Sequence, residues 1–211
     1  MINSVSSILS EKIETPINKR LNTPPFLVVV EDGKQSDIKR LYLENLPLKS
    51  YAISLDIAEN KFCGDERAQF LRLNHYLNKS NDKGINKRCD LVLFTEEGID
   101  NTESIYIFDL KSSDPDPEEV CMQLVNSEIF IKYILELVKF FNKTDISKVS
   151  FYKVVCTTRV RKRVPYANIQ LRTKLARKNT FYETYQVKEV TVLPEHNKKA
   201  RLNFTELSRL F

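Results

Sequence analysis

Asp90, Asp109 and Lys111 are the residues whose types and spacing best fit a catalytic centre. Asp109 and Lys111 lie two positions apart at the end of the segment 105–111, and side chains at that spacing share one face of a β-strand. Two carboxylates held by strands can bind Mg²⁺ or Mn²⁺, which prefer hard oxygen ligands and retain water molecules. A neighbouring lysine can orient or deprotonate an attacking water, or neutralise charge that develops on a phosphate. The combination predicts metal-dependent hydrolysis of phosphodiester bonds.

The segments that carry these three residues are predicted to form a β-hairpin. Cys89–Phe94 and Ser104–Leu110 are short apolar runs joined by the polar connector 95–103. Antiparallel pairing brings Asp90, at the start of one strand, beside the end of the other. We therefore expect the three charged groups to meet at one edge of the sheet.

The rest of the chain predicts an α/β (α+β) protein with a mixed central sheet flanked by helices. Apolar runs predict further strands at 26–30, 51–56, 149–158 and 185–193. Helical patterns lie at 3–14, 36–45, 65–77, 114–141 and 168–178. The 211 residues fit a single domain (1–211), with 1–60 as an N-terminal extension packed on the core, 64–140 as the motif region and 151–211 as a basic C-terminal part.

The hairpin motif resembles the PD-(D/E)xK superfamily of restriction-endonuclease-like nucleases. The resemblance is carried by Asp90 and by Asp109-Leu-Lys111, and Ser112-Ser113 with Gln123-Leu124 resembles the ELKSS…QL variant of that family. It covers about residues 64–140, a third of the chain. It implies a restriction-endonuclease-like fold, with a mixed central sheet flanked by helices, and an Mg²⁺- or Mn²⁺-dependent endonuclease.

The same resemblance assigns roles to individual residues. It implies that Asp90 and Asp109 are metal ligands, that the Leu110 carbonyl is a further ligand, and that Lys111 is catalytic. It implies an orienting role for Gln123. An acidic residue from the helix before the hairpin completes the site in that family. Glu66 matches this residue best, as a ligand or as a group behind the ligands, and Asp65 and Glu59 are the alternatives.

Charge is distributed unevenly along the chain. Residues 151–211 contain 14 of the 33 basic residues and 4 of the 28 acidic ones, whereas the net charge of the whole chain is only +5. A basic end beside a carboxylate-bearing part suits a protein that holds a polyanion against a metal site. The residues that we expect to contact nucleic acid are Arg159, Arg161, Lys162, Arg163, Arg172, Lys174, Arg177 and Lys178. The alternative is a solvated basic face that binds no partner.

Two alternatives to an active nuclease of this family stay open. In the first, Asp109 and Lys111 form a surface ion pair, and the chain is a catalytically idle nucleic-acid-binding or assembly subunit. In the second, the strand before Glu31, with Asp56 as a later strand-end carboxylate, resembles a TOPRIM domain, which would also bind Mg²⁺ and nucleic acid. No paired Asp-x-Asp follows on a predicted strand in that pattern.

Composition argues against several other kinds of functional site and against a membrane protein. Only two histidines are present and the four cysteines form no Cys-x-x-Cys pair, which argues against a histidine-rich metal cage, a zinc ribbon and a thioredoxin-type motif. No apolar run reaches the length of a membrane span and the N-terminus does not resemble a signal peptide, so we expect a cytoplasmic protein without membrane contact. DNA is the expected partner and RNA the less favoured one. The family resemblance implies an ATPase or other regulatory partner and a role in antiviral defence. A homodimer is expected if the protein cuts both strands of DNA.

Overall fold

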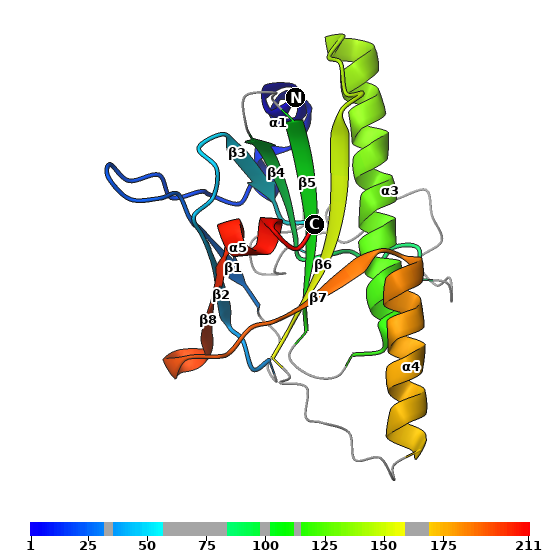
Figure 1. Cartoon of the computed structure of the whole chain (residues 1–211). Coiled ribbons are helices and arrows are strands. Elements are labelled where there is room, and N and C mark those ends of the chain that lie inside the picture. Colours follow the sequence, from blue (N-terminus) through cyan, green and yellow to red (C-terminus); the bar gives the residue numbers. More distant parts are fainter. Residues whose placement is uncertain (32–35, 57–83, 98–101, 112–114, 159–168) are drawn as a thin grey trace, which may run out of the picture.

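The structure is a computed structural model that describes residues 1–31, 36–56, 84–97, 102–111, 115–158 and 169–211. Side chains are described over the same ranges except at 97, 102 and 169–176. The helix that we expected at 65–77 lies outside the described residues. The described part is a mixed α/β structure with two sheets (Figure 1).

The larger sheet contains the predicted hairpin. Its five strands follow the order β3-β4-β5-β6-β7, in which the first two pairs are antiparallel and the last two are parallel. The strands are β3 (Ser50–Ile53), β4 (Leu91–Glu97), β5 (Thr102–Lys111), β6 (Val149–Thr157) and β7 (Val187–Thr191). The hairpin of β4 and β5 and the mixed character of the sheet are therefore as the sequence predicts.

The smaller sheet has three strands in the order β1-β2-β8. β1 (Leu27–Val30) pairs with β2 (Arg40–Glu44) in antiparallel orientation, and β2 pairs with β8 (Lys199–Asn203) in parallel orientation. β8 was missed at the sequence level, and so was α5 (Phe204–Ser208), which follows it.

β2 corrects our expectation of a helix at 36–45. Burial in this strand alternates, with Leu41 and Leu43 facing the core and Arg40, Tyr42 and Glu44 facing outward. Ser36, the first residue of the expected helix, donates its hydroxyl to the Ile38 carbonyl at 2.5 Å. Alternation with a period of two fits a strand and cannot bury a helix face, so packing decides the structure of this segment.

The helices α1 (Ile2–Ile8), α3 (Pro117–Asn142) and α4 (Ile169–Thr184) cover one face of the larger sheet (Figure 1). α3 begins as the sequence predicts, because Asp116 accepts the Glu118 backbone N–H at 2.9 Å and Pro117 occupies the first turn. α1 is shorter than the predicted 3–14, and the 3-10 helix η1 (Glu11–Ile13) follows it. α4 extends beyond the predicted 168–178, so β7 begins later than the predicted 185.

The larger sheet is the middle layer of the structure. On one face, Ile105 and Ile107 of β5 pack with residues of α3 such as Leu124 and Ile131. On the other face, Tyr106 and Phe108 pack against the smaller sheet. The 3-10 helix η3 (His196–Lys198) leads into β8. Both faces of β5 are thus buried, and its charged end lies at the margin of the core.

Three cysteines, Cys89, Cys121 and Cys156, are buried free thiols in this core. Burial raises the pKa of Cys121 to about 11 and that of Cys156 to about 12. Such thiols are poor nucleophiles at neutral pH, and they pack as small apolar side chains. Across the described ranges, the helices do not combine the length and hydrophobicity that crossing a membrane requires.

Candidate active site

The structure brings Asp90, Asp109 and Lys111 together at the end of β5. Leu91 pairs with Phe108, so Asp90 is placed opposite Asp109 one step further along the two strands. The Asp90 backbone N–H donates to the Phe108 carbonyl at 3.0 Å, and the Leu110 backbone N–H donates to Asp90 Oδ2 at 2.5 Å. These two bonds fix the Asp90 carboxyl group against the end of β5.

Lys111 contacts the second carboxylate directly. Its Nζ donates to Asp109 Oδ1 at 3.2 Å and lies 3.0 Å from Asp109 Oδ2. Asp109 has an exposed side-chain fraction of 0%, whereas that of Lys111 is 25%. The lysine therefore covers a buried carboxylate from the solvent side.

Burial perturbs both acids. The pKa of Asp109 is raised from 3.8 to about 6. Burial is the main cause of the rise, and the positive charge of Lys111 opposes it. The pKa of Asp90 is raised well above its ordinary value by burial and by repulsion from Asp109, while the Leu110 N–H opposes that rise. Two close acids with raised pKa values form an environment that gains from a cation.

The same two carboxylates influence Lys111. Burial on its own lowers the pKa of an ammonium group, but the attraction of Asp109 and Asp90 is larger in sum, and the pKa of Lys111 is raised. The ammonium is thus the charged form at neutral pH. In this state it serves more readily as an electrostatic or orienting group than as a base.

Two further carboxylates lie near enough to act on this site. Glu31, which follows β1, raises the pKa of Asp90, and Asp56, which follows β3, raises that of Asp109. They follow strands of different sheets, so the strand-to-strand pattern that would resemble a TOPRIM domain is not continued within one sheet. Asp56 also forms an ion pair with Arg88, in which Arg88 Nη2 lies 2.9 Å from Asp56 Oδ1.

Gln123 does not contact the carboxylates. Its Nε2 donates to the Arg88 carbonyl at 3.3 Å, just before Asp90 in the chain. Ser127, one turn further along α3, accepts the Cys89 backbone N–H at 2.9 Å and donates to the Gln123 carbonyl at 2.8 Å. α3 thus holds the segment that leads into Asp90, through Gln123 and Ser127. Ser127 was missed at the sequence level, although a serine on the apolar face of a helix was a usable signal.

The donor set fits a hard divalent cation in part. Asp109 Oδ2 is a buried oxygen without a hydrogen-bond donor within the described part of the chain, although the Lys111 ammonium lies nearby. Mg²⁺ is commonly bound by one or two carboxylates together with water and substrate phosphate, so Asp90 and Asp109 meet the minimum. No group of three or more His, Cys, Asp or Glu arranged for a metal is found among the described residues. Glu66, Asp65 and Glu59 lie outside that range.

Part of the predicted nucleic-acid interface can be placed. Arg177 pairs with Glu118 at 2.8 Å, and Lys178 pairs with Glu189 at 2.5 Å, so both are neutralised by acids of this chain. Arg172 and Lys174 belong to α4, but their side chains are not described. The segment 159–163, with Arg159, Arg161, Lys162 and Arg163, lies outside the described residues, as do Ser112 and Ser113.

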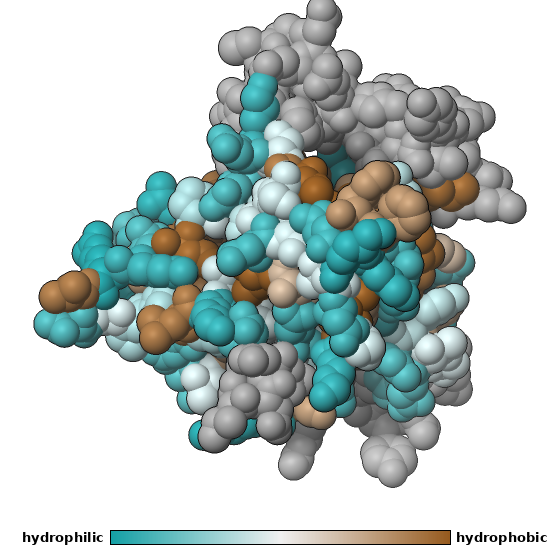
Figure 2. Space-filling view, turned by 90° about the horizontal axis from the view of Figure 1, so that it is seen from above, coloured by the Kyte–Doolittle hydropathy of each residue, from teal (hydrophilic) through white to brown (hydrophobic). Residues whose placement is uncertain are grey.

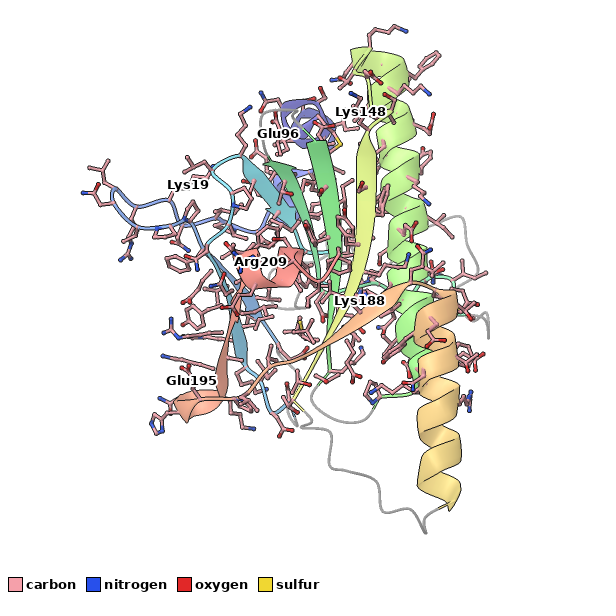
Figure 3. All side chains as sticks on the ribbon, viewed as in Figure 1. Lys19, Glu96, Lys148, Lys188, Glu195 and Arg209 are labelled. Atoms are coloured by element: carbon pink, nitrogen blue, oxygen red, sulfur yellow. The ribbon has the colours of Figure 1, made fainter. Side chains whose placement is uncertain are left out.

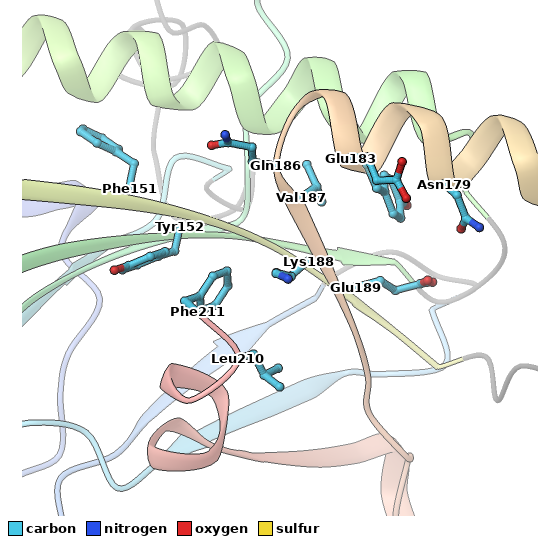
Figure 4. Close-up of a pocket in the computed structure, with 11 residues that line it drawn as sticks. Phe151, Tyr152, Asn179, Glu183, Gln186, Val187, Lys188, Glu189, Leu210 and Phe211 are labelled. Atoms are coloured by element: carbon cyan, nitrogen blue, oxygen red, sulfur yellow. The ribbon is translucent and has the colours of Figure 1, made fainter.

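A cavity of about 530 Å³ lies elsewhere, between α4, β7 and the C-terminal segment (Figure 4). Its lining includes Tyr152, Tyr182 and Phe211 together with Lys188 and Glu189. None of the three predicted catalytic side chains lines it. The cavity is therefore separate from the candidate active site.

Comparison of the chain with models of protein families, with curated proteins and with solved structures finds no match.

Proposed function

We propose that this protein is a metal-dependent nuclease that hydrolyses phosphodiester bonds of DNA. The observation that carries the proposal is the convergence of Asp90, Asp109 and Lys111 at one end of β5, with Lys111 Nζ within 3.2 Å of both oxygens of a buried carboxylate. The order of residue types along the two strands is the one that the PD-(D/E)xK resemblance requires. The five-stranded mixed sheet backed by α3 is consistent with a restriction-endonuclease-like core.

Each side chain has a task that follows from its position. Asp90 and Asp109 would hold Mg²⁺ or Mn²⁺, with the Leu110 carbonyl as a further ligand. The ion supplies Lewis acidity and a bound water of lowered pKa. Lys111, partly exposed and charged, would contact the phosphate or the attacking water and stabilise negative charge as the bond breaks.

The test is cleavage of defined substrates. Supercoiled plasmid, single-stranded DNA and RNA are incubated with the protein in Mg²⁺, Mn²⁺ or EDTA. We expect metal-dependent nicking of DNA, with a loss of about 100-fold or more in the variants Asp109→Ala and Lys111→Ala. Lys148→Ala, at the opposite end of the molecule, is the matched control and should cleave as the wild type does (Figure 3). Equal cleavage by the wild type and both site variants would refute the proposal.

One observation favours a second candidate, a binding or assembly protein with an idle site. Lys111 already neutralises Asp109, and such a pair could be purely structural. Titration calorimetry with Mn²⁺ separates the two functions. Heat that disappears in Asp109→Ala supports the nuclease, whereas the absence of both heat and nicking across salt and pH supports the idle site. An activating ATPase or regulatory partner, as the family resemblance implies, would restore nicking but not be needed for metal binding.

A further inference from the structure

The outer face of the smaller sheet carries two unpaired cations side by side. Arg40 of β2 is the register partner of Lys199 of β8, and both side chains face outward because their neighbours Leu41 and Ala200 are buried. Across β1, Val30 continues the same row and its exposed fraction is 61%. Like charges directly opposite each other on neighbouring strands are unfavourable unless an anion lies between them.

The next row of this face is neutralised within the protein. Arg201 lies over the Tyr42 ring, with its guanidinium carbon 5.4 Å from the ring centroid, and pairs with Glu44. Its Nε also lies 3.5 Å from Glu195 Oε2. By contrast, within the part of the chain that the structure describes, Arg40 and Lys199 have neither an ion pair nor a side-chain hydrogen bond. Of these two rows, only the row of Arg40 and Lys199 therefore offers unpaired positive charge.

This row lies at the end of the molecule that carries the candidate active site. In Figure 1, β2 and β8 begin at the lower end, where β5 and β6 also end. Asp37, three residues before Arg40, is 3.5 Å from the hydroxyl of Thr158, which directly follows β6. Glu31, which directly follows Val30, acts electrostatically on Asp90. The basic row and the carboxylates thus lie at the same end of the two sheets.

From these positions we infer that Arg40 and Lys199 form a nucleic-acid contact site that holds backbone phosphates flanking the scissile bond. The inference rests on the proposed nuclease function. A polynucleotide placed at Asp109 extends past the reacting phosphate, and its neighbouring phosphates require cations. The two described cations of the α4 region, Arg177 and Lys178, are already paired with acids, whereas this pair is free. The contact binds backbone phosphates and does not depend on the base sequence.

The decisive experiment measures binding without cleavage. A fluorescent DNA duplex is titrated in EDTA, over a range of salt concentrations, with the wild type and with the double variant Arg40→Gln/Lys199→Gln. The slope of log K against log salt is negative, and loss of two phosphate contacts should make it less steep by about 1.8. The double variant Lys139→Gln/Lys148→Gln removes two exposed lysines from the opposite end and should keep the wild-type slope. That end, seen in Figure 2, is a mixed surface of hydrophilic and scattered hydrophobic residues.

The outcomes separate this inference from the nuclease proposal. An unchanged slope and affinity in Arg40→Gln/Lys199→Gln overturns the inference, even if the wild type nicks DNA. A reduced slope in a protein that neither binds Mn²⁺ nor cleaves DNA supports the contact site and refutes the nuclease. Equal competition by polyglutamate would show that the row binds acidic polypeptides, which also overturns the inference. Both side chains face outward, so we expect the unfolding temperature of the double variant to lie within a few degrees of the wild type. The single change Arg40→Gln should make the salt slope less steep by about 0.9.

Discussion

Asp90 Oδ2 accepts the backbone N–H of Leu110 at 2.5 Å, and Leu110 stands between the two other predicted site residues. One hydrogen bond therefore joins the carboxyl group at the start of β4 to the strand that carries Asp109 and Lys111. The bond also provides a partner for a backbone donor at the end of the sheet. Asp90 thus has a structural task as well as the proposed metal-binding one, and the two tasks respond differently to substitution.

Replacement of Asp90 by Asn or by Ala distinguishes these tasks. Both changes remove the negative charge, so both should abolish Mn²⁺ binding measured by calorimetry. Only Asn retains an oxygen that can accept the Leu110 N–H. We expect Asp90→Ala to be about 1–3 kcal/mol less stable than Asp90→Asn in urea unfolding, because a buried donor loses its partner. Equal stability of the two variants would contradict the structural task, and retained Mn²⁺ affinity in Asp90→Asn would contradict the metal-binding one.

Asp109→Asn should stabilise the metal-free protein at neutral pH. The pKa of Asp109 is raised from 3.8 to about 6, so the folded state holds a proton that the unfolded state has released between these values. Stability of the wild type should therefore fall as pH rises through this window, by a contribution on the order of 3 kcal/mol. The variant lacks this ionisation, and its advantage in unfolding free energy should be large at pH 7 and small at pH 4.

Addition of Mn²⁺ provides the control for this prediction. Metal binding stabilises only a protein that can bind it, so the wild type should gain stability with rising Mn²⁺ while Asp109→Asn should not. A wild type that becomes more stable between pH 4 and 6 in EDTA, by an amount that Asp109→Asn removes, would show that the charged carboxylate is favoured by folding. That result would contradict the burial argument.

The hairpin and its charged end were predictable because local signals agree there. Apolar residues alternate along β5, the charges fall at the strand end, and Asp90 opens the preceding strand, so period and position both point to one arrangement. The extent of burial was not predictable. From its place at a strand end, Asp109 is expected at the margin of a cleft. Its side chain instead has an exposed fraction of 0%, because segments distant in the sequence pack over it.

Contacts between distant segments account for most of what the sequence did not reveal. Arg40 and Lys199 become neighbours only through the parallel pairing of β2 with β8, and a parallel pair has no short connection that marks it in the sequence. The segment 36–45 was expected to be a helix, whereas the alternation of Leu41 and Leu43 was the signal that agrees with the observed strand. The pairing of Lys178 with Glu189 likewise needed the position of β7 beside α4.

Lys111→Met should separate metal binding from turnover. The ammonium pairs with Asp109, while Asp90 is held by the Leu110 backbone N–H, so we expect its loss to leave the two carboxylates in place. We expect Mn²⁺ to bind Lys111→Met at least as tightly as the wild type, because the internal cation no longer competes for Asp109. Cleavage should fall by about 100-fold or more, since the group that stabilises the developing phosphate charge is gone. Loss of Mn²⁺ affinity together with turnover would instead make Lys111 a structural partner of the carboxylate.

Ser127→Ala should weaken the site from a distance. The Ser127 hydroxyl accepts the Cys89 N–H at 2.9 Å, and without it a buried donor directly before Asp90 has no partner, which should cost about 1–3 kcal/mol of stability. The Asp90 carboxyl group would then be held less firmly, and Mn²⁺ affinity should fall by about 10-fold to 100-fold, as is usual for groups that orient ligands.

Ser50→Ala is the matched control for that change. It removes another buried hydroxyl, which donates to the Pro47 carbonyl at 2.7 Å, at the end of β3 remote from the carboxylates. Both variants should lose stability, but only Ser127→Ala should lose Mn²⁺ affinity when the titration is run far below either unfolding temperature. If Ser50→Ala reduced the affinity by the same factor, the effect would reflect general loosening of the fold, and α3 would have no specific part in positioning Asp90.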